Sequence, residues 1–542
     1  MLMKSQLPTD NILYVQDVKS RIHLILELEE LLLKQKITYL QDVTDSDATT
    51  TYEKGRQQLS DKLDTLRRSV KLDFLSRDDV PLRTRARWKQ SLRATGVTEE
   101  EARLIQDYLR IEATMLTKSG EPVSDLYAAL FDADEPTRKQ AFLSIEEAFR
   151  TNESVIQRLF SQLVDLRQAR ASASHQTGYE ALAFAELGRI DYTSNDVDHY
   201  ASIIQTYFLP IKQQFQLEQQ TFLGKQALHP WDVRQSAYTQ IDHHLTGSDS
   251  SFLDKAQAIL ENVHPSFADL LKEMRQANHL DIGAWSNKAG GGFCEYLPVE
   301  RQSFLFMNRM QTFDDLVIFM HEMGHAVHHD TMKETYDGLQ PIPLEVGEFA
   351  AMSLELLTMN EWHQVIPDRK DVARAKLEQI RSIVEFLPQT IIVDRFQSWL
   401  YAHPDHLPEE RQASFARLRE TYDTDVIDWS ETPDWKGLEW MSVIHMFETP
   451  FYYIEYAIAQ LAALELYHRF TKDPDETIKD FLAALALSQT HSIQEVYARA
   501  GVSFLPSDVG MKELLTFLEG HIEVWTKELE QSDDGDVKKK KP

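Results

Sequence analysis

The sequence predicts a mainly α-helical protein built as two closely packed lobes. The chain has 542 residues, 42% of them hydrophobic, and glycine and proline are sparse at 19 residues each. A chain of this size can bury a large core, and few helix-breaking residues favour long helices. Length alone suggests roughly three or four domains, but no serine- or glycine-rich linker divides the chain. We therefore expect one unit with two lobes.

The charge of the chain limits its partners. The formal net charge is −29 at pH 7, which disfavours nucleic acid and anionic membrane surfaces because both attract basic proteins. The single cysteine, Cys294, excludes an intramolecular disulfide and has no evident base beside it. No targeting signal is visible, and the apolar run 22–33 is too short and too acidic to span a bilayer. We expect a cytoplasmic protein that binds neither nucleic acid nor membranes.

Residues 1–170 are expected to form an amino-terminal helical lobe. Amphipathic patterns run through residues 18–170, with polar interruptions at 44–47 and 119–122. The helical pattern continues through residues 171–280, with a good helix start at 194–197.

Two features of residues 171–280 concern histidines. The segment His229–Val233 is a break after which the chain can approach a site formed elsewhere. His243 and His244 are adjacent, but neighbouring side chains on a helix diverge by about 100°. That pair is therefore not expected to bind one ion.

Residues 281–312 are the best candidate for β-structure. Phe293, Tyr296 and the run Ser303–Asn308 predict two short strands, with the glycines at 290–292 as a flexible approach. An exposed edge strand here could hold an extended peptide through main-chain hydrogen bonds, which recognise any sequence. A simple structural hairpin explains the pattern equally well.

The stretch 314–330 contains the motif His321-Glu322-x-x-His325 within an apolar helical pattern. Side chains four positions apart on an α-helix differ by about 40° and about 6 Å of rise, so both imidazoles can converge on one ion. Glu322 is rotated by about 100° from His321, which keeps it beside any water that the metal holds. Catalytic zinc normally takes three protein ligands and keeps one position open, so a third ligand is required.

His328 is not expected to be that third ligand. About 10 Å of rise separates it from His321 on a straight helix, too far for one tetrahedral ion to bind both with His325. We interpret His328 as a histidine on the surface or behind the ligands. The metzincin spacing would need glycine at 328 and histidine at 331, where the chain has Thr331.

A helix expected over residues 343–358 provides three acids, Glu345, Glu348 and Glu355, at spacings that place them on one stripe. Any of the three could face the ion. Glu348 is our choice for the ligand because it lies one turn into the helix after a proline break. Glu355 is then expected to orient a ligand histidine. A solvated helix face is the alternative for each glutamate taken alone.

The segment 445–456 holds a second group of candidates. Pro450 is expected to open a helix on which Tyr452, Tyr453 and Tyr456 lie on neighbouring turns, where phenol hydroxyls can aim at an oxyanion. Tyrosines at helical spacing are also typical of a packed core.

These motifs resemble the thimet oligopeptidase and oligoendopeptidase F family of zinc peptidases, and most of all its oligoendopeptidase F and Pz-peptidase branch. The resemblance rests on the runs 321–328 and 345–353, and the segments 187–193, 288–295 and 445–456 agree with it. It implies a two-lobed helical zinc-peptidase fold with a deep channel and a small β-sheet next to the active-site helix.

The resemblance also implies a division of the chain. Residues 1–170 would form the channel wall or lid, and residues 171–525 the catalytic region. Residues 526–542, which end in a basic run, are expected to be a charged, disordered tail.

The activity implied by the resemblance is zinc-dependent hydrolysis of internal peptide bonds in short oligopeptides, as in peptide catabolism. One Zn²⁺ per chain would be held by His321, His325 and Glu348, with Glu322 as the general base. Donors to the oxyanion would come from His445, Tyr453 and Tyr456, of which Tyr456 fits best. Two alternatives stay open: a zinc hydrolase of non-peptide amides, and a catalytically silent helical binding protein that retains zinc. The sequence does not predict the oligomeric state.

Overall fold

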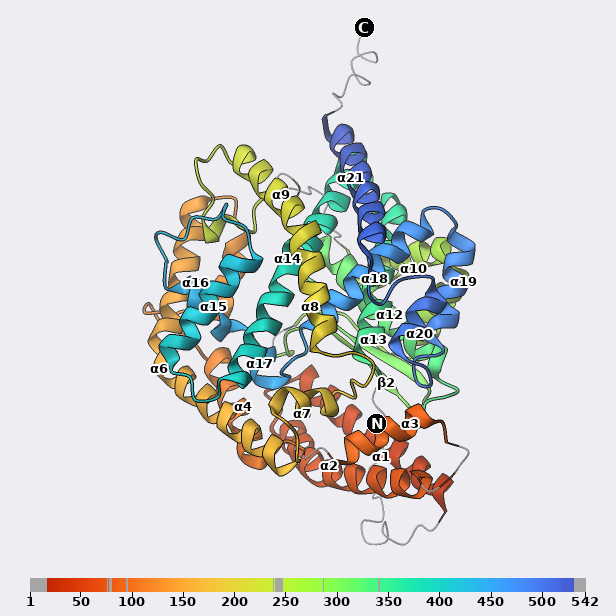
Figure 1. The fold of residues 1–542 in the computed structure, drawn as a ribbon. Coiled ribbons are helices and arrows are strands. Elements are labelled where there is room, and N and C mark those ends of the chain that lie inside the picture. Colours follow the sequence, from red (N-terminus) through yellow and green to blue (C-terminus); the bar gives the residue numbers. More distant parts are fainter. Residues whose placement is uncertain are drawn as a thin grey trace.

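The structure is a computed structural model that describes residues 17–75, 77, 80–93, 96–236, 238, 247–285, 287–339 and 342–530. Helices make up most of the described chain, and a single small sheet lies among them (Figure 1), which confirms the predicted fold class. His243, His244 and residues 531–542 of the expected tail lie outside the described residues. None of the described helices is both long enough and apolar enough to cross a membrane.

The amino-terminal helices form a layer at one end of the molecule (red in Figure 1). Asp17 caps the first of them by accepting a hydrogen bond from the backbone N–H of Ser20 at 3.1 Å. The break between the first two helices spans residues 42–45 and overlaps the predicted polar segment 44–47. This layer contains α1 (Val18–Gln41), α2 (Ser46–Leu75) and α3 (Leu82–Arg93).

A second group of helices combines early and late parts of the chain around one hydrophobic core. Residues 104–184 contribute one side of this core and residues 392–451 the other. The buried Arg167 joins the two sides because it forms an ion pair with Glu101 at 2.9 Å and donates to the Tyr401 hydroxyl at 3.0 Å. The helices are α4 (Glu99–Ala113), α5 (Val123–Leu126), α6 (Glu135–Ala173), α7 (Tyr179–Glu186), α15 (Pro408–Tyr422), α16 (Trp435–Leu438) and α17 (His445–Glu448).

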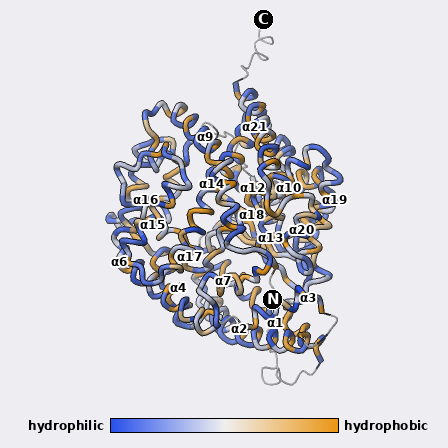
Figure 2. The backbone as a smooth tube through the Cα atoms, viewed as in Figure 1, coloured by the Kyte–Doolittle hydropathy of each residue, from blue (hydrophilic) through white to orange (hydrophobic). Residues whose placement is uncertain are grey.

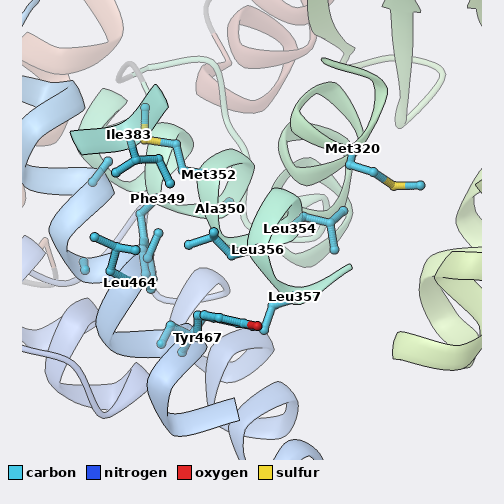
Figure 3. Close-up of a cluster of buried hydrophobic side chains, with 14 of the residues drawn as sticks. Met320, Phe349, Ala350, Met352, Leu354, Leu356, Leu357, Ile383, Leu464 and Tyr467 are labelled. Carbon is cyan, nitrogen blue, oxygen red and sulfur yellow. The ribbon is translucent and has the colours of Figure 1, made fainter. Parts of the chain in front are cut away.

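The largest hydrophobic core surrounds α13, which packs between α12 and α18. Figure 3 shows Phe349 and Leu357 of α13 near Leu464 and Tyr467 of α18. Unlike these buried helices, α2 consists mostly of hydrophilic residues (Figure 2). The helices of this group are α8 (Ser194–Ile203), α9 (Leu209–Phe222), α10 (Asp249–Val263), α11 (Pro265–Gln276), α12 (Asp314–Met332), α13 (Leu344–Leu357), α14 (Arg369–Ala402), α18 (Ile454–Phe470), α19 (Pro474–Leu485), α20 (Ile493–Ala500) and α21 (Asp508–Glu530).

The sheet has three strands in the order β1-β3-β2. β2 (Phe293–Leu297) runs antiparallel to β3 (Gln302–Phe306), and the short β1 (Leu280–Asp281) runs parallel to β3. Both strands expected within 281–312 are confirmed, and β2 lies at an edge of the sheet. Because β2 and β3 both contact α12, the sheet lies directly beside the helix that carries the histidine pair.

A close crossing of two helices fixes the position of the motif. Gly324, the second variable residue of His-Glu-x-x-His, lies where α12 meets α13. A Cβ atom at Gly324 would be 2.5 Å from the Cα of Ala351 and 2.6 Å from the carbonyl oxygen of Ala350. Only glycine permits this approach, which brings the acids of α13 close to the histidines of α12.

Candidate metal centre

Three of the predicted residues form a group that could hold a metal ion. Donor atoms of His321 and His325, one turn apart on α12, and of Glu348 on α13 all lie within 4.8 Å of one another. The Nε2 of His321 is 3.6 Å from Oε2 of Glu348. The imidazole planes of His321 and His325 are inclined at 82°, with ring centroids 5.0 Å apart. Two imidazoles and one carboxylate are a donor set that catalytic zinc takes.

Glu355 sets the orientation of His321. The Nδ1 of His321 and Oε1 of Glu355 are 2.7 Å apart, and Gln379 of α14 donates to the other oxygen of Glu355, also at 2.7 Å. When Nδ1 carries the proton that it donates to Glu355, the Nε2 lone pair faces Glu348. Burial opposes a charge on His321, but Glu355, Glu348 and Glu322 raise its pKa to about 9. This cluster of carboxylates favours a cation.

One carboxylate oxygen of Glu348 accepts a hydrogen bond, and the other accepts none from the described residues. The Tyr452 hydroxyl donates to Oε1 of Glu348 at 2.8 Å. The second oxygen, Oε2, is buried and has no hydrogen-bond partner among the described residues. Because a buried carboxylate oxygen without a partner is costly, this atom fits a metal ligand better than a structural acid. The residues present therefore fit a zinc ion.

Glu322 lies beside this group, as expected from its place in the motif. Its side chain is buried, and a Cβ atom at Gly292 would be 3.4 Å from its Oε1. The loop before β2 therefore passes close to the carboxylate. Burial raises the pKa of Glu322 to about 7, with His321 opposing and Glu348 adding to the shift. A carboxyl group with such a pKa can accept and release a proton near neutral pH.

The aromatic candidates form a cluster, but the local structure differs from the prediction. The ring centroid of His445 lies 5.2 Å from that of Tyr452, 5.3 Å from that of Tyr453 and 6.3 Å from that of Tyr456. Burial lowers the pKa of His445.

The expectation that Pro450 opens the helix of this segment is wrong. The helix α18 begins at Ile454, so Tyr452 and Tyr453 precede it and only Tyr456 lies on it. Phe451 has φ of +66°, and this left-handed residue turns the chain before the helix starts.

The third acid of the predicted stripe, Glu345, has a different role. Its Oε1 accepts hydrogen bonds from the hydroxyl of Tyr192 at 2.7 Å and from Nε of Arg189 at 3.3 Å. Arg189, which is itself buried, also pairs with Glu455 of α18. This buried ion-pair network therefore joins α13 to α18 behind the metal ligands. It also explains the segment 187–193, whose polar residues had no predicted function.

Of the two interpretations of His328, on the surface or behind the ligands, the first is wrong. Its side chain is completely buried, and neither ring nitrogen has a hydrogen-bond partner among the described residues. Burial lowers its pKa to about 4. His328 is not part of the group of metal donors.

Comparison with known proteins agrees with the motifs. The model of peptidase family M3 matches residues 130–514, which is more than half of the chain. The chain belongs to peptidase family M3. The family resemblance inferred from the sequence is therefore confirmed.

Individual members of the family are distant. The chain is 22% identical over 391 residues to an oligoendopeptidase F homolog of Borreliella burgdorferi, covering 67% of this chain. It is 21% identical over 405 residues to the group B oligopeptidase PepB of Streptococcus agalactiae, covering 69% of this chain. Each match spans only 61% of the relative. The solved structure of Pz peptidase A with an inhibitor superposes with a TM-score of 0.84 at 20% identity over 95% of both chains, so the two share a fold.

Proposed function

We propose that this protein is a zinc-dependent endopeptidase that hydrolyses internal bonds of short oligopeptides. The observation that carries the proposal is the convergence of His321, His325 and Glu348 within 4.8 Å, with Glu322 next to them. Membership of peptidase family M3 agrees with peptide hydrolysis. The names of the two bacterial relatives, an oligoendopeptidase homolog and an oligopeptidase, support short peptides as substrates.

The first step assigned to the chain is proton transfer by Glu322. His321, His325 and Glu348 would hold the zinc ion, which would supply a Lewis acid for the scissile carbonyl and would lower the pKa of a water from about 16 to about 7. Glu322 takes a proton from the attacking water and later passes it to the leaving amine nitrogen. Its pKa of about 7 suits both directions of transfer. Glu355 keeps His321 in the tautomer that leaves Nε2 free.

The second step assigned to the chain is stabilisation of the carbonyl oxygen as it becomes negative. Tyr456, together with His445 or Tyr453, would donate hydrogen bonds to that oxygen, and one such donor is worth roughly 3 kcal/mol. Tyr452 would instead hold Glu348, to which it is hydrogen-bonded at 2.8 Å. A substitution Tyr452→Phe is therefore expected to weaken zinc binding, whereas Tyr456→Phe lowers the turnover rate.

The edge strand β2 would hold the peptide backbone. It lies beside α12. Burial raises the pKa of the Cys294 thiol on this strand, and the nearby charge of Glu322 adds to the shift. Main-chain pairing with an edge strand accepts many sequences, as a broad oligopeptidase requires.

The test uses three substrates with one purified preparation: a quenched fluorescent oligopeptide blocked at both ends, a folded protein and a non-peptide amide. We expect cleavage of the blocked peptide alone, its loss on chelation and its return with zinc. Cleavage of the non-peptide amide in preference to the peptide would replace the proposal with the amide hydrolase. A bound zinc with no cleavage of any substrate would favour the binding-protein alternative.

A further inference from the structure

A cavity of about 380 Å³ adjoins the candidate metal centre on the side of His321. Its wall includes Glu355, which holds His321, and Ile318, one turn before His321 on α12. Phe386 lines the same cavity, and its ring lies 6.1 Å from Tyr453 and 5.6 Å from Tyr456. The cavity is therefore placed to receive part of a molecule whose reacting bond lies at the metal centre.

Arg234 is the residue of this cavity that peptide hydrolysis does not explain. It follows directly after the His229–Val233 break, and its guanidinium lies over the ring of Phe131 at 5.4 Å. Gln235 fixes the same contact because its side-chain amide donates to the carbonyl oxygen of Phe131 at 2.8 Å. A guanidinium stacked in this way keeps its in-plane N–H groups available for a ligand.

The other charges of the cavity have partners of their own. Glu378 forms a two-bond ion pair with Arg381, at 2.6 and 2.9 Å. Glu355 accepts from His321 and Gln379, both at 2.7 Å. Arg234, by contrast, forms no ion pair with a carboxylate of any described residue, and its strongest charged neighbour is Arg381.

Asp314 is the remaining acid of the cavity wall and does not neutralise Arg234. It forms no ion pair with Arg234, although the two attract each other at longer range. Burial raises the pKa of Asp314, with Glu378 and Asp315 adding to the shift. Arg234 is thus a cation that Glu378, Glu385 and Asp314 attract at longer range, but that forms no ion pair with any described carboxylate.

We propose that Arg234 determines substrate specificity by binding a carboxylate of the peptide in this cavity. A guanidinium offers two parallel N–H donors that match a carboxylate, which an ammonium or an amide cannot do. The carboxylate is either the carboxyl terminus of the peptide or an aspartate or glutamate side chain. This inference rests on the proposed peptidase function, because the peptide is taken to lie across the metal centre.

The test measures binding rather than turnover, so it does not depend on catalysis. Zinc-loaded Glu322→Gln protein is titrated with four fluorescent peptides of equal length. One has a free carboxyl terminus and no acidic side chain, and one is its carboxyl-terminal amide. The third is an amide with one glutamate, and the fourth is the same amide with glutamine in its place. Each titration is repeated in double variants that add Arg234→Gln, Arg234→Lys, Asp314→Asn or Arg417→Gln. Arg417 is a matched control because it is an exposed arginine of α15 that does not line the cavity.

We expect Arg234→Gln to weaken binding about 10-fold or more for carboxylate-bearing peptides only. Loss confined to the free carboxyl terminus identifies the terminus as the ligand, and loss confined to the glutamate peptide identifies a side chain. Asp314→Asn and Arg417→Gln should leave these affinities within about twofold, and Arg234→Lys should recover only part of the loss.

Three outcomes would overturn the inference: equal loss for all four peptides, no loss for any of them, or no measurable binding of any peptide. Cleavage by the protein with Glu322 intact tests the proposed function separately. Equal cleavage of the amide peptides and the carboxylate-bearing peptides, with or without Arg234, would support the peptidase function and contradict carboxylate binding by Arg234.

Discussion

The helices that carry the candidate metal ligands and the amino-terminal layer are held in place by different interactions. Around the metal centre, α12, α13 and α18 pack through completely buried apolar side chains such as Phe319, Phe349 and Leu464. The α1–α2 hairpin has a much smaller core, centred on Ile25 and Leu28.

Both apolar and polar contacts attach α1 to the sheet: Ile37 of α1 packs with Leu297 of β2 and Phe306 of β3 in a small cluster. Lys36 pairs with Glu295 of β2 at 2.8 Å, and Oε2 of Glu30 accepts from the backbone N–H groups of Val299 and Glu300 at 2.6 and 3.0 Å. The apolar core around the candidate ligands is much larger than the cluster between α1 and the sheet, so water and salt can weaken a larger share of the contacts that hold α1. Substitutions in the two regions should therefore change the free energy of unfolding by different amounts and with different salt dependence.

The largest effect is expected at the crossing of α12 and α13. Gly324→Ala places a Cβ atom 2.5 Å from the Cα of Ala351, so the helices must separate, at a cost of about 3 kcal/mol or more in the free energy of unfolding. Urea unfolding measures the loss. Gly520→Ala in α21 is the control, because a Cβ atom there meets nothing within 4 Å and should be neutral or stabilising by up to about 1 kcal/mol. Equal stability of the two variants would refute the close crossing.

His328 should make the same region sensitive to acid. Burial lowers its pKa from 6.5 to about 4, so between these values the unfolded chain binds the extra proton. The free energy of unfolding is therefore not reduced by His328 above about pH 6.5, and it decreases as the pH falls toward 4. At pH 5 this loss amounts to about 2 kcal/mol.

His328→Leu removes that loss, so its stability relative to the original protein should rise between pH 7 and pH 5. Unfolding at both pH values measures the difference. His403→Leu, at an exposed position, should change the pH dependence much less. An unchanged pH dependence in His328→Leu would mean that another group controls acid sensitivity.

Glu355→Gln should reduce zinc affinity while the fold remains intact. Glutamine removes the charge that orients His321 through a 2.7 Å hydrogen bond, and such changes weaken metal binding by about 10-fold or more. Competition with a chelator measures the dissociation constant. Glu361→Gln, on a partly exposed residue that contacts Asn262 and Gln364, should leave the dissociation constant unchanged. Undiminished affinity in Glu355→Gln would remove the orienting role.

The smallest effect is expected at the attachment of α1. Lys36→Met breaks the pair with Glu295, whose partners are 35% and 31% exposed, so the loss should stay below about 1 kcal/mol and vanish at high salt. Thermal unfolding at low and high salt measures it. Lys479→Met, which breaks a more exposed pair with Glu476, should cost less still. A salt-independent loss of several kcal/mol would mean that α1 is held as tightly as the metal-binding helices.

The sequence predicts the parts of the site that depend on local helix geometry. His321, His325 and Glu322 follow from spacing on one helix, and Glu348 follows from its place in the next. The fold class and both strands of the hairpin were also predictable, because composition and alternation are local properties.

Contacts between distant segments could not be predicted in the same way. Gln379 and Arg189 reach their partners only because separate helices and loops come together, and the role proposed for Arg234 depends on the same kind of assembly. The wrong interpretation of His328 has the same origin, since its spacing does not show that it would be buried. At Pro450 the missed signal is Phe451, whose left-handed backbone no simple rule indicates.

The most direct test of the central claim combines metal content and turnover in Glu322→Gln. If His321, His325 and Glu348 hold zinc and Glu322 moves the proton, this variant keeps one zinc per chain and its thermal stability but loses at least about 100-fold in kcat on the blocked oligopeptide. Zinc retained with most of the activity would contradict the role of Glu322. Loss of zinc together with activity would contradict the assignment of the ligands.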